Sequence, residues 1–134
     1  MVTRRFALLG ALLCLTTVVL AGCGGDSGLT FSQLPPGDPA NGEALFTRQV
    51  NGTPACNSCH TVDGSPLSGP TLQGLSARAG NQVAGLGSGD YVLQSITQPA
   101  AHLVPGFSNL MYGQYGERLT GQQLADVIAY VLAQ

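Results

Sequence analysis

The 134-residue chain contains no lysine and no tryptophan, and charged residues make up only 9% of it. Its basic residues are five arginines, so the sequence lacks the basic patch that nucleic-acid binding requires. It also lacks the alternating apolar and polar pattern of β-strands. Its four cysteines fall in an N-terminal apolar run and in one short motif, which leaves none for a disulfide framework. These absences indicate an all-α protein with long loops.

A C-x-x-C-H motif occupies residues 56–60 and is the signature of covalent c-type haem attachment. Cys56 and Cys59 lie three residues apart, so one helical turn places both thiols on the same face. There they can add to the two vinyl groups of one porphyrin. His60 is then carried beneath the ring, where an imidazole nitrogen can bind the iron. We therefore expect one covalently bound haem c.

Zinc sites and redox pairs also use closely spaced cysteines, and the sequence favours neither. A zinc site usually needs a second pair of ligands, but no second C-x-x-C and no H-x3-H pattern is present. A thioredoxin-like redox pair lies on a βαβ pattern and does not require His60. A chance cluster is the remaining alternative, which three uncommon residue types at fixed offsets disfavour.

Residues 1–22 have the parts of an export signal. A short basic region with two arginines precedes an apolar run that is too short to span a membrane as a helix. Small residues then precede Cys23, and residues 20–23 resemble the bacterial lipobox. By that resemblance Cys23 would be lipidated, and the alternative is a signal for soluble export. We expect a lipid-anchored protein at the outer face of the cytoplasmic membrane or in the periplasm.

Residues 23–37 are predicted to form a flexible linker that begins at the lipidated cysteine. Glycine and proline are frequent in this segment, and no apolar face repeats along it. Fully extended, the part of the linker after Cys23 would reach about 45–50 Å, and as a flexible coil it would typically span about 20 Å. Such a linker would let the domain search for partners close to the membrane.

Residues 38–134 are predicted to form one domain of four to five short helices and long loops. Asp38 before Pro39 predicts a helix N-cap and a first helical residue, with the helix continuing to Thr47. A short helix is expected at the C-x-x-C-H motif, and another over residues 90–97. A domain of this size with few large apolar residues is marginal on its own core, so we expect the haem to supply part of that core.

The last helix has the strongest pattern. Thr120 and Gln123 form a capping box at its start. Apolar residues then recur with helical spacing on one face: Leu124, Val127, Ile128, Val131 and Leu132. Residues 80–89 and 100–116 between the helices are predicted to be loops, because glycines or other loop-forming residues interrupt every periodic pattern there.

The iron bound by His60 needs a second donor on the opposite face of the haem, and the residues alone leave two candidates. Once the leader is removed, Met111 is the one methionine and His102 is the one other imidazole. Both fall in the same predicted loop, so reach does not choose between them. The apolar stretch around Met111 suits a buried pocket and favours the methionine.

The domain resembles a class I, single-haem cytochrome c along its whole length. The resemblance rests on residues 37–46, on the C-x-x-C-H motif, on Gly69-Pro70-x-Leu72, and on the stretches 104–111 and 115–120. The last two stretches are particularly similar to the cytochrome c domain fused to subunit II of haem-copper oxidases. Without a copper domain or spanning helices in this sequence, the chain resembles a free-standing bacterial lipoprotein of that kind.

The resemblance implies a ligand set for the haem iron. Met111 would be the sixth ligand, and the carbonyl of Pro70 would accept a hydrogen bond from the second ring nitrogen of His60. One residue departs from the family pattern, because Tyr112 follows Met111 where the family usually has proline. This departure implies a less rigid ligand loop.

Two further contacts are expected around the domain. The resemblance implies that Gly42 and Phe46 pack against an aromatic residue of the last helix, here Tyr130. Arg78 has two open interpretations, because it can pair with a haem propionate through a charge-assisted contact or remain a solvated loop arginine.

These features favour an electron carrier that passes single electrons between respiratory complexes, with a terminal oxidase as the expected acceptor. The expected partners are a donor complex, an acceptor and the membrane, with no nucleic acid. Ligation by His60 and Met111 closes both faces of the iron, and no Ser-His-Asp set is evident, so we expect no enzyme. The alternatives are a haem enzyme or gas or redox sensor with a displaceable sixth ligand, which Tyr112 keeps open, and a fixed subunit of a respiratory complex.

Overall fold

The structure is a computed structural model that describes residues 28–134. Within this range it contains three short 3-10 turns, one isolated β-bridge and no β-strand. The α-helices are α1 (Pro39–Phe46), α2 (Leu75–Arg78), α3 (Ser88–Thr97), α4 (Tyr115–Arg118) and α5 (Gly121–Val131). The 3-10 turns are η1 (Phe31–Gln33), η2 (Cys56–Ser58) and η3 (Ala79–Asn81). The prediction of an all-α fold with four to five short helices is therefore confirmed.

The predicted leader, residues 1–22, and the predicted lipidation site, Cys23, lie outside the described residues. Among residues 28–134, no helix is long and apolar enough to cross a membrane. The described part of the chain folds around a core that all of the longer helices share.

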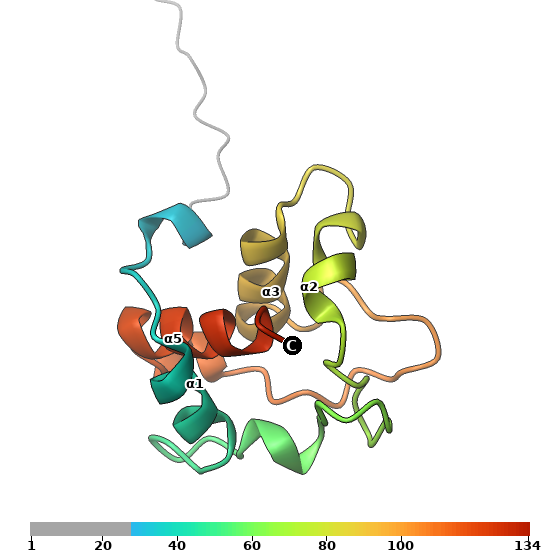
Figure 1. The fold of residues 1–134 in the computed structure, drawn as a ribbon, viewed down its shortest axis with the longest axis horizontal. Helices are drawn as coiled ribbons and strands as arrows, with labels where there is room; N and C mark the ends of the chain where they lie inside the picture. The colour runs from blue at the N-terminus through green and yellow to red at the C-terminus, as the bar shows by residue number, and fades with distance from the viewer. Residues whose placement is uncertain (1–27) are drawn as a thin grey trace, which may run out of the picture.

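Helices α1 and α5 pack directly on each other and lie side by side in Figure 1. Gly42 stands at their crossing, where a Cβ atom would collide with the backbone carbonyl of Asp126. The rings of Phe46 and Tyr130 meet there with centroids 5.3 Å apart. The contacts predicted for Gly42 and Phe46 with Tyr130 are therefore present, and they let the two helix backbones approach closely.

The predicted caps of these two helices are confirmed. The carboxylate of Asp38 accepts hydrogen bonds from the backbone N–H groups of Ala40 at 2.8 Å and Asn41 at 3.4 Å. At the start of α5, the Thr120 hydroxyl accepts from the Gln123 backbone N–H at 3.2 Å, and the Gln123 side chain accepts from the Thr120 backbone N–H at 2.9 Å. These bonds satisfy N–H groups that a helix start leaves without partners.

A buried carboxylate joins the beginning of α1 to α5. Asp126 is 4% exposed and accepts a hydrogen bond from the Asp38 backbone N–H at 2.8 Å. It also accepts one at 2.8 Å from the side chain of Gln122, which in turn donates to the carbonyl of Pro36 at 2.9 Å. The chain that enters α1 is therefore fixed to α5 by polar contacts as well as by packing.

Part of the segment predicted as a flexible linker packs on the domain. The turn η1 lies against α3, where the Phe31 backbone N–H donates to the Asp90 carboxylate at 2.8 Å. Together with the contact of Pro36 to Gln122, this bond gives residues 31–37 a defined place on the domain. This part of the predicted linker therefore contacts the domain, and the predicted boundary at residue 38 stays a prediction.

Short helices occur where the sequence predicted loops or nothing regular. Helix α3 begins at Ser88, two residues earlier than expected, and α4 falls at the end of the predicted loop 100–116. Helix α2 follows Gly74, whose φ of 67° is left-handed and suits glycine. Four-residue helices are too short to show a periodic apolar pattern, which is why the sequence did not indicate them.

Candidate functional site

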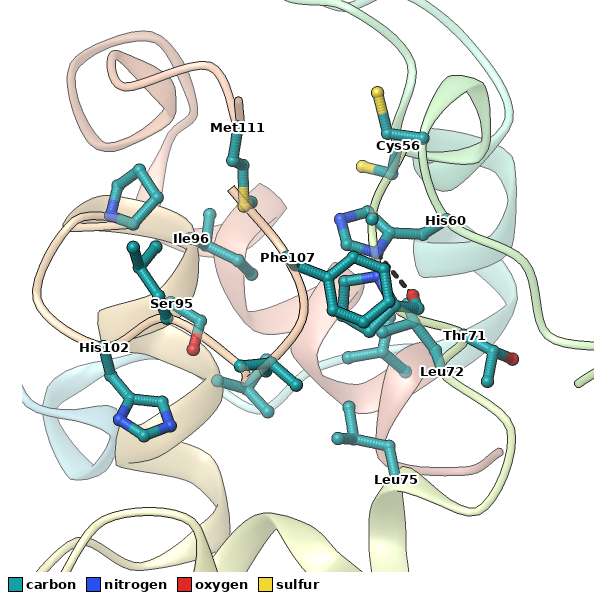
Figure 2. A pocket seen from close by; sticks show the side chains of 18 of the residues that line it. Cys56, His60, Thr71, Leu72, Leu75, Ser95, Ile96, His102, Phe107 and Met111 are labelled. Atoms are coloured by element: carbon teal, nitrogen blue, oxygen red, sulfur yellow. Dashed lines mark hydrogen bonds between the residues drawn. The ribbon is translucent and has the colours of Figure 1, made fainter. Parts of the chain in front are cut away.

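An apolar cavity of about 330 Å³ opens in the domain, and residues of the connection between α3 and α4 line one side of it (Figure 2). Its volume is within the range of ligand and cofactor sites. Core residues of α1 and α5 line the bottom of the cavity, and the connections 47–74 and 98–114 form its walls. The apolar side chains that line it include Phe46, Leu72, Leu75, Val92, Ile96, Val104, Phe107, Val127 and Val131.

Both motif cysteines reach this cavity from the turn η2. The backbone N–H groups of Cys59 and His60 donate to the Cys56 carbonyl at 3.1 and 3.0 Å, which winds the motif into one tight turn. Burial raises the pKa of the Cys56 thiol to about 11, so this thiol is uncharged at neutral pH. The surroundings disfavour a thiolate, whereas an uncharged thioether suits them.

The imidazole of His60 is held in one orientation by the loop that follows the motif. Its Nδ1 lies 2.8 Å from the carbonyl oxygen of Pro70, which is the contact that the resemblance implied. The adjacent Gly69 donates to the Cys59 carbonyl at 3.0 Å, and a Cβ atom on it would lie 2.6 Å from the His60 ring. With Nδ1 donating to Pro70, Nε2 is the ring nitrogen left to bind a metal.

Met111 lines the same cavity from the opposite wall. Figure 2 shows its thioether and the His60 ring on opposite sides of the pocket. The neighbouring Tyr112 supports the loop, because its ring packs edge-on against Tyr115 with centroids 5.2 Å apart. Its hydroxyl donates to the side-chain oxygen of Gln114 at 2.8 Å. Aromatic packing therefore orders the loop where proline was expected.

Arg78 is tied to the backbone beside the pocket. Its two terminal nitrogens donate to the carbonyls of Gln73 and Thr71, and the side chain is half-buried and lines the cavity. Of the two open interpretations, the structure shows Arg78 bonded to the backbone rather than freely solvated. A contact between its remaining N–H donors and a propionate stays a prediction.

His102 lines the cavity as well, although the sequence placed it simply in a loop. Its ring meets Tyr91 edge-on, with centroids 5.9 Å apart and planes at 73°. Its Nε2 is buried and has no hydrogen-bond partner within residues 28–134. Nothing in the sequence around His102 distinguished a buried imidazole from an exposed one, so this feature comes from the structure alone.

The residues around the cavity fit a haem c. The apolar lining suits a macrocycle, the two thiols lie on one turn, and an imidazole and a thioether approach from opposite walls. The lining includes Arg78 and two histidines but no acidic residue among those described, which suits a group that carries carboxylates. The described residues contain no group of three His, Cys, Asp or Glu side chains placed to hold a metal ion by themselves.

Two comparisons with known proteins found a resemblance to this chain. The model of the family described as cytochrome c matches residues 39–134, which run from the first residue of α1 to the C-terminal residue. Cytochrome c from Ginkgo biloba is 41% identical over 58 residues. This segment covers 42% of the present chain and 46% of the Ginkgo protein, so the chain spans less than half the length of that relative.

Proposed function

The chain belongs to the cytochrome c family, and we propose that it is a single-haem electron carrier anchored by lipid at the outer face of a bacterial membrane. Proteins of this family are haem electron carriers rather than enzymes, and their cofactor is covalently bound haem c. The observation that carries the proposal is the meeting of Cys56, Cys59, His60 and Met111 around one apolar cavity.

Each of these side chains has a distinct proposed role. Cys56 and Cys59 would form the thioether bonds to a bound haem, and His60 and Met111 would supply the two side chains that bind its iron. Bound haem supplies an iron centre that exchanges one electron at a time. The carbonyl of Pro70 fixes the His60 tautomer and increases the basicity of the ligating nitrogen. The apolar lining disfavours water at the site, which suits electron transfer.

The proposed docking surface is the apolar rim of the cavity. Val104, Phe107 and Met111 lie along this rim, and Leu103 and Leu110 beside them are 46% and 69% exposed. Because the chain has no lysine, long-range electrostatic attraction to an acidic partner is weak. We therefore expect the rate of electron transfer to fall only moderately between low and physiological ionic strength.

The proposed partners are a donor complex and a terminal oxidase or similar acceptor of a respiratory chain. This part of the proposal rests on the similarity of residues 104–120 to the cytochrome c domain of oxidase subunit II, and on the export signal. The proposed anchor is Cys23. Cys23→Ser is expected to move the protein from the membrane fraction to the soluble fraction with an unchanged haem spectrum, because acyl chains contribute about 0.8 kcal/mol per buried CH2. A mature N-terminus other than Cys23 would contradict the anchor.

The experiment that tests the electron-carrier proposal is visible spectroscopy and potentiometry of the purified protein. The oxidised wild type is expected to show the weak charge-transfer band of methionine ligation near the red edge of the spectrum. Met111→Ala removes this band and lowers the reduction potential, because a soft thioether favours the reduced iron. His102→Phe keeps the band.

Carbon monoxide distinguishes a carrier from a haem enzyme or sensor. A carrier with a stable sixth ligand gives no carbon monoxide difference spectrum when reduced, and the packing of Tyr112 on Tyr115 favours such a stable ligand loop. Binding of carbon monoxide by the wild-type protein, or loss of the charge-transfer band on substitution of His102, would contradict the proposal.

A further inference from the structure

His102 presents a buried hydrogen-bonding atom for which the folded chain provides no partner. Nearly all buried polar groups in native proteins are hydrogen-bonded, and leaving one unpaired costs about 1–3 kcal/mol. The Nε2 of His102 is such a group, and the residue lines the proposed haem cavity. Its partner is therefore to be sought in what fills the cavity.

The position of His102 in the cavity indicates which part of a haem it meets. Figure 2 shows His102 at the end of the pocket remote from Cys56. The thioether bonds form at the edge of the porphyrin that carries the vinyl groups, and the two propionates leave the ring at the opposite edge. The end of the cavity remote from Cys56 is therefore the end that receives carboxylates.

Two of the other polar side chains that line the cavity already have partners within the chain. Both terminal nitrogens of Arg78 donate to backbone carbonyls, and the Ser95 hydroxyl donates to the Tyr91 carbonyl at 2.8 Å. The edge-on packing of Tyr91 fixes the plane of the His102 ring. His102 is thus an oriented donor without an acceptor, and no acidic side chain lines the cavity among the described residues to serve as one.

We propose that the imidazole of His102 donates a hydrogen bond from Nε2 to a propionate of the haem and thereby raises its reduction potential. A charge-assisted bond to a carboxylate withdraws negative charge from the ring edge, which disfavours the oxidised iron relative to the reduced iron. His102 is then neither an iron ligand nor a passive loop residue. This inference rests on the proposed haem site.

Two substitutions separate the hydrogen bond from the packing of the ring. His102→Phe keeps an aromatic ring against Tyr91 but removes the donor, and His102→Gln keeps an N–H donor of similar reach. Ser95→Ala is the matched control, because it removes a cavity-lining polar group that already has a partner within the chain. All variants are compared as holoproteins with covalent haem.

We expect His102→Phe to lower the equilibrium constant for reduction about tenfold, which is about 59 mV for a one-electron couple. His102→Gln and Ser95→Ala should remain close to the wild type. All four proteins should keep the charge-transfer band of methionine ligation. In NMR spectra of the reduced wild type, the imidazole Nε2–H proton should exchange slowly with solvent.

Three results would overturn the inference: equal potentials for the His102 variants and wild type, a fast-exchanging Nε2–H proton, or loss of the charge-transfer band in His102→Phe. The last result would make His102 an iron ligand. Haem staining of the wild type after denaturing electrophoresis tests the haem site separately. Its absence would refute the proposed function, and this inference with it.

Discussion

Helices α1 and α5 meet through direct packing, whereas the connections 47–74 and 98–114 meet across a cavity of about 330 Å³. On the first side, the absence of a side chain at Gly42 lets the backbones of α1 and α5 come into contact. The Asp126 carboxylate there accepts a hydrogen bond from the Asp38 backbone N–H. On the second side, the walls contribute apolar surface that faces the cavity instead of another side chain. The side formed by α1 and α5 is therefore stabilised by the protein alone, whereas the cavity side is stabilised by the cofactor.

The substitution with the largest expected effect removes the covalent link on the cavity side. Cys56→Ser combined with Cys59→Ser should abolish haem staining after denaturing electrophoresis, since thioether bonds survive conditions that strip a non-covalent haem. Hydrogen exchange should become fast in the cavity walls and stay slower in α1 and α5.

Ser58→Ala lies on the same turn and is the matched control, which should keep its haem. Covalent haem in the double variant would refute the attachment site. An equal loss of hydrogen-exchange protection in α1, in α5 and in the cavity walls would show that the two sides are not stabilised differently.

The same chemical change, Gly→Ala, can be made both between α1 and α5 and at the cavity, and it should affect different properties at the two places. Gly42→Ala forces a Cβ atom into the Asp126 carbonyl and should lower the free energy of unfolding by about 3 kcal/mol, with an unchanged visible spectrum. Gly69→Ala pushes on the His60 ring and should alter the spectrum instead. Chemical denaturation and absorption spectra of both holoproteins measure these effects.

Gly113→Ala is the control for both substitutions, because a Cβ atom there meets no atom within 4 Å. It should change neither stability nor spectrum. A spectral change in Gly42→Ala without loss of stability would show that the two sides are not separate in the way that we describe.

Asp126→Ala tests the polar contacts between α1 and α5. It removes the charged acceptor of the Asp38 backbone N–H, which should cost about 2 kcal/mol in the free energy of unfolding. Asp126→Asn keeps an oxygen acceptor and should cost less. Thermal or urea unfolding provides the measurement, and an equal loss of stability in both variants would contradict the role of the hydrogen bond.

The smallest expected effect concerns Tyr115, which donates to the Pro54 carbonyl at 2.9 Å just before the haem motif. Burial raises the pKa of Tyr115 to about 12 from 10.0, so the folded state favours the protonated phenol. The resulting stability is present below pH 10 and is lost as the pH rises toward 12.

Tyr115→Phe should cost about 1 kcal/mol at neutral pH and should flatten the decline of stability between pH 10 and 12. Because the chain has no lysine, few other side chains of the holoprotein titrate in this range. Unfolding curves at several pH values provide the test. A decline as steep in Tyr115→Phe as in the wild type would assign it to another group, for which Tyr130 is a candidate because burial also raises its pKa.

The sequence predicted the protein-stabilised side well. Caps and apolar periodicity are local signals. Asp38 predicted the start of α1, and Thr120 with Gln123 predicted the start of α5. The C-x-x-C-H motif is local as well, so the attachment site could be predicted from it. Long helices and short fixed motifs share the property that neighbours in the chain determine them.

The cavity side was harder to predict, because its contacts join residues far apart in the chain. Helix α2 has only four residues, and the contact of Gly69 with the His60 ring leaves no periodic signal. Burial of His102 depends on how the connection after α3 folds over the pocket. The seating of η1 on α3 depends in the same way on a contact between Phe31 and Asp90.

If Cys23 is the membrane anchor, the packing of η1 on α3 limits how far the domain can lie from that anchor. With the Phe31 N–H bonded to Asp90, only residues 24–30 separate the proposed anchor from the domain, and their extended length would be at most about 25 Å, half of the 45–50 Å calculated for a linker that ended at Gly37. The volume swept from one anchor point shrinks roughly eightfold. Under the proposed anchoring, a carrier with so short a connection would reach only partners close to it in the membrane.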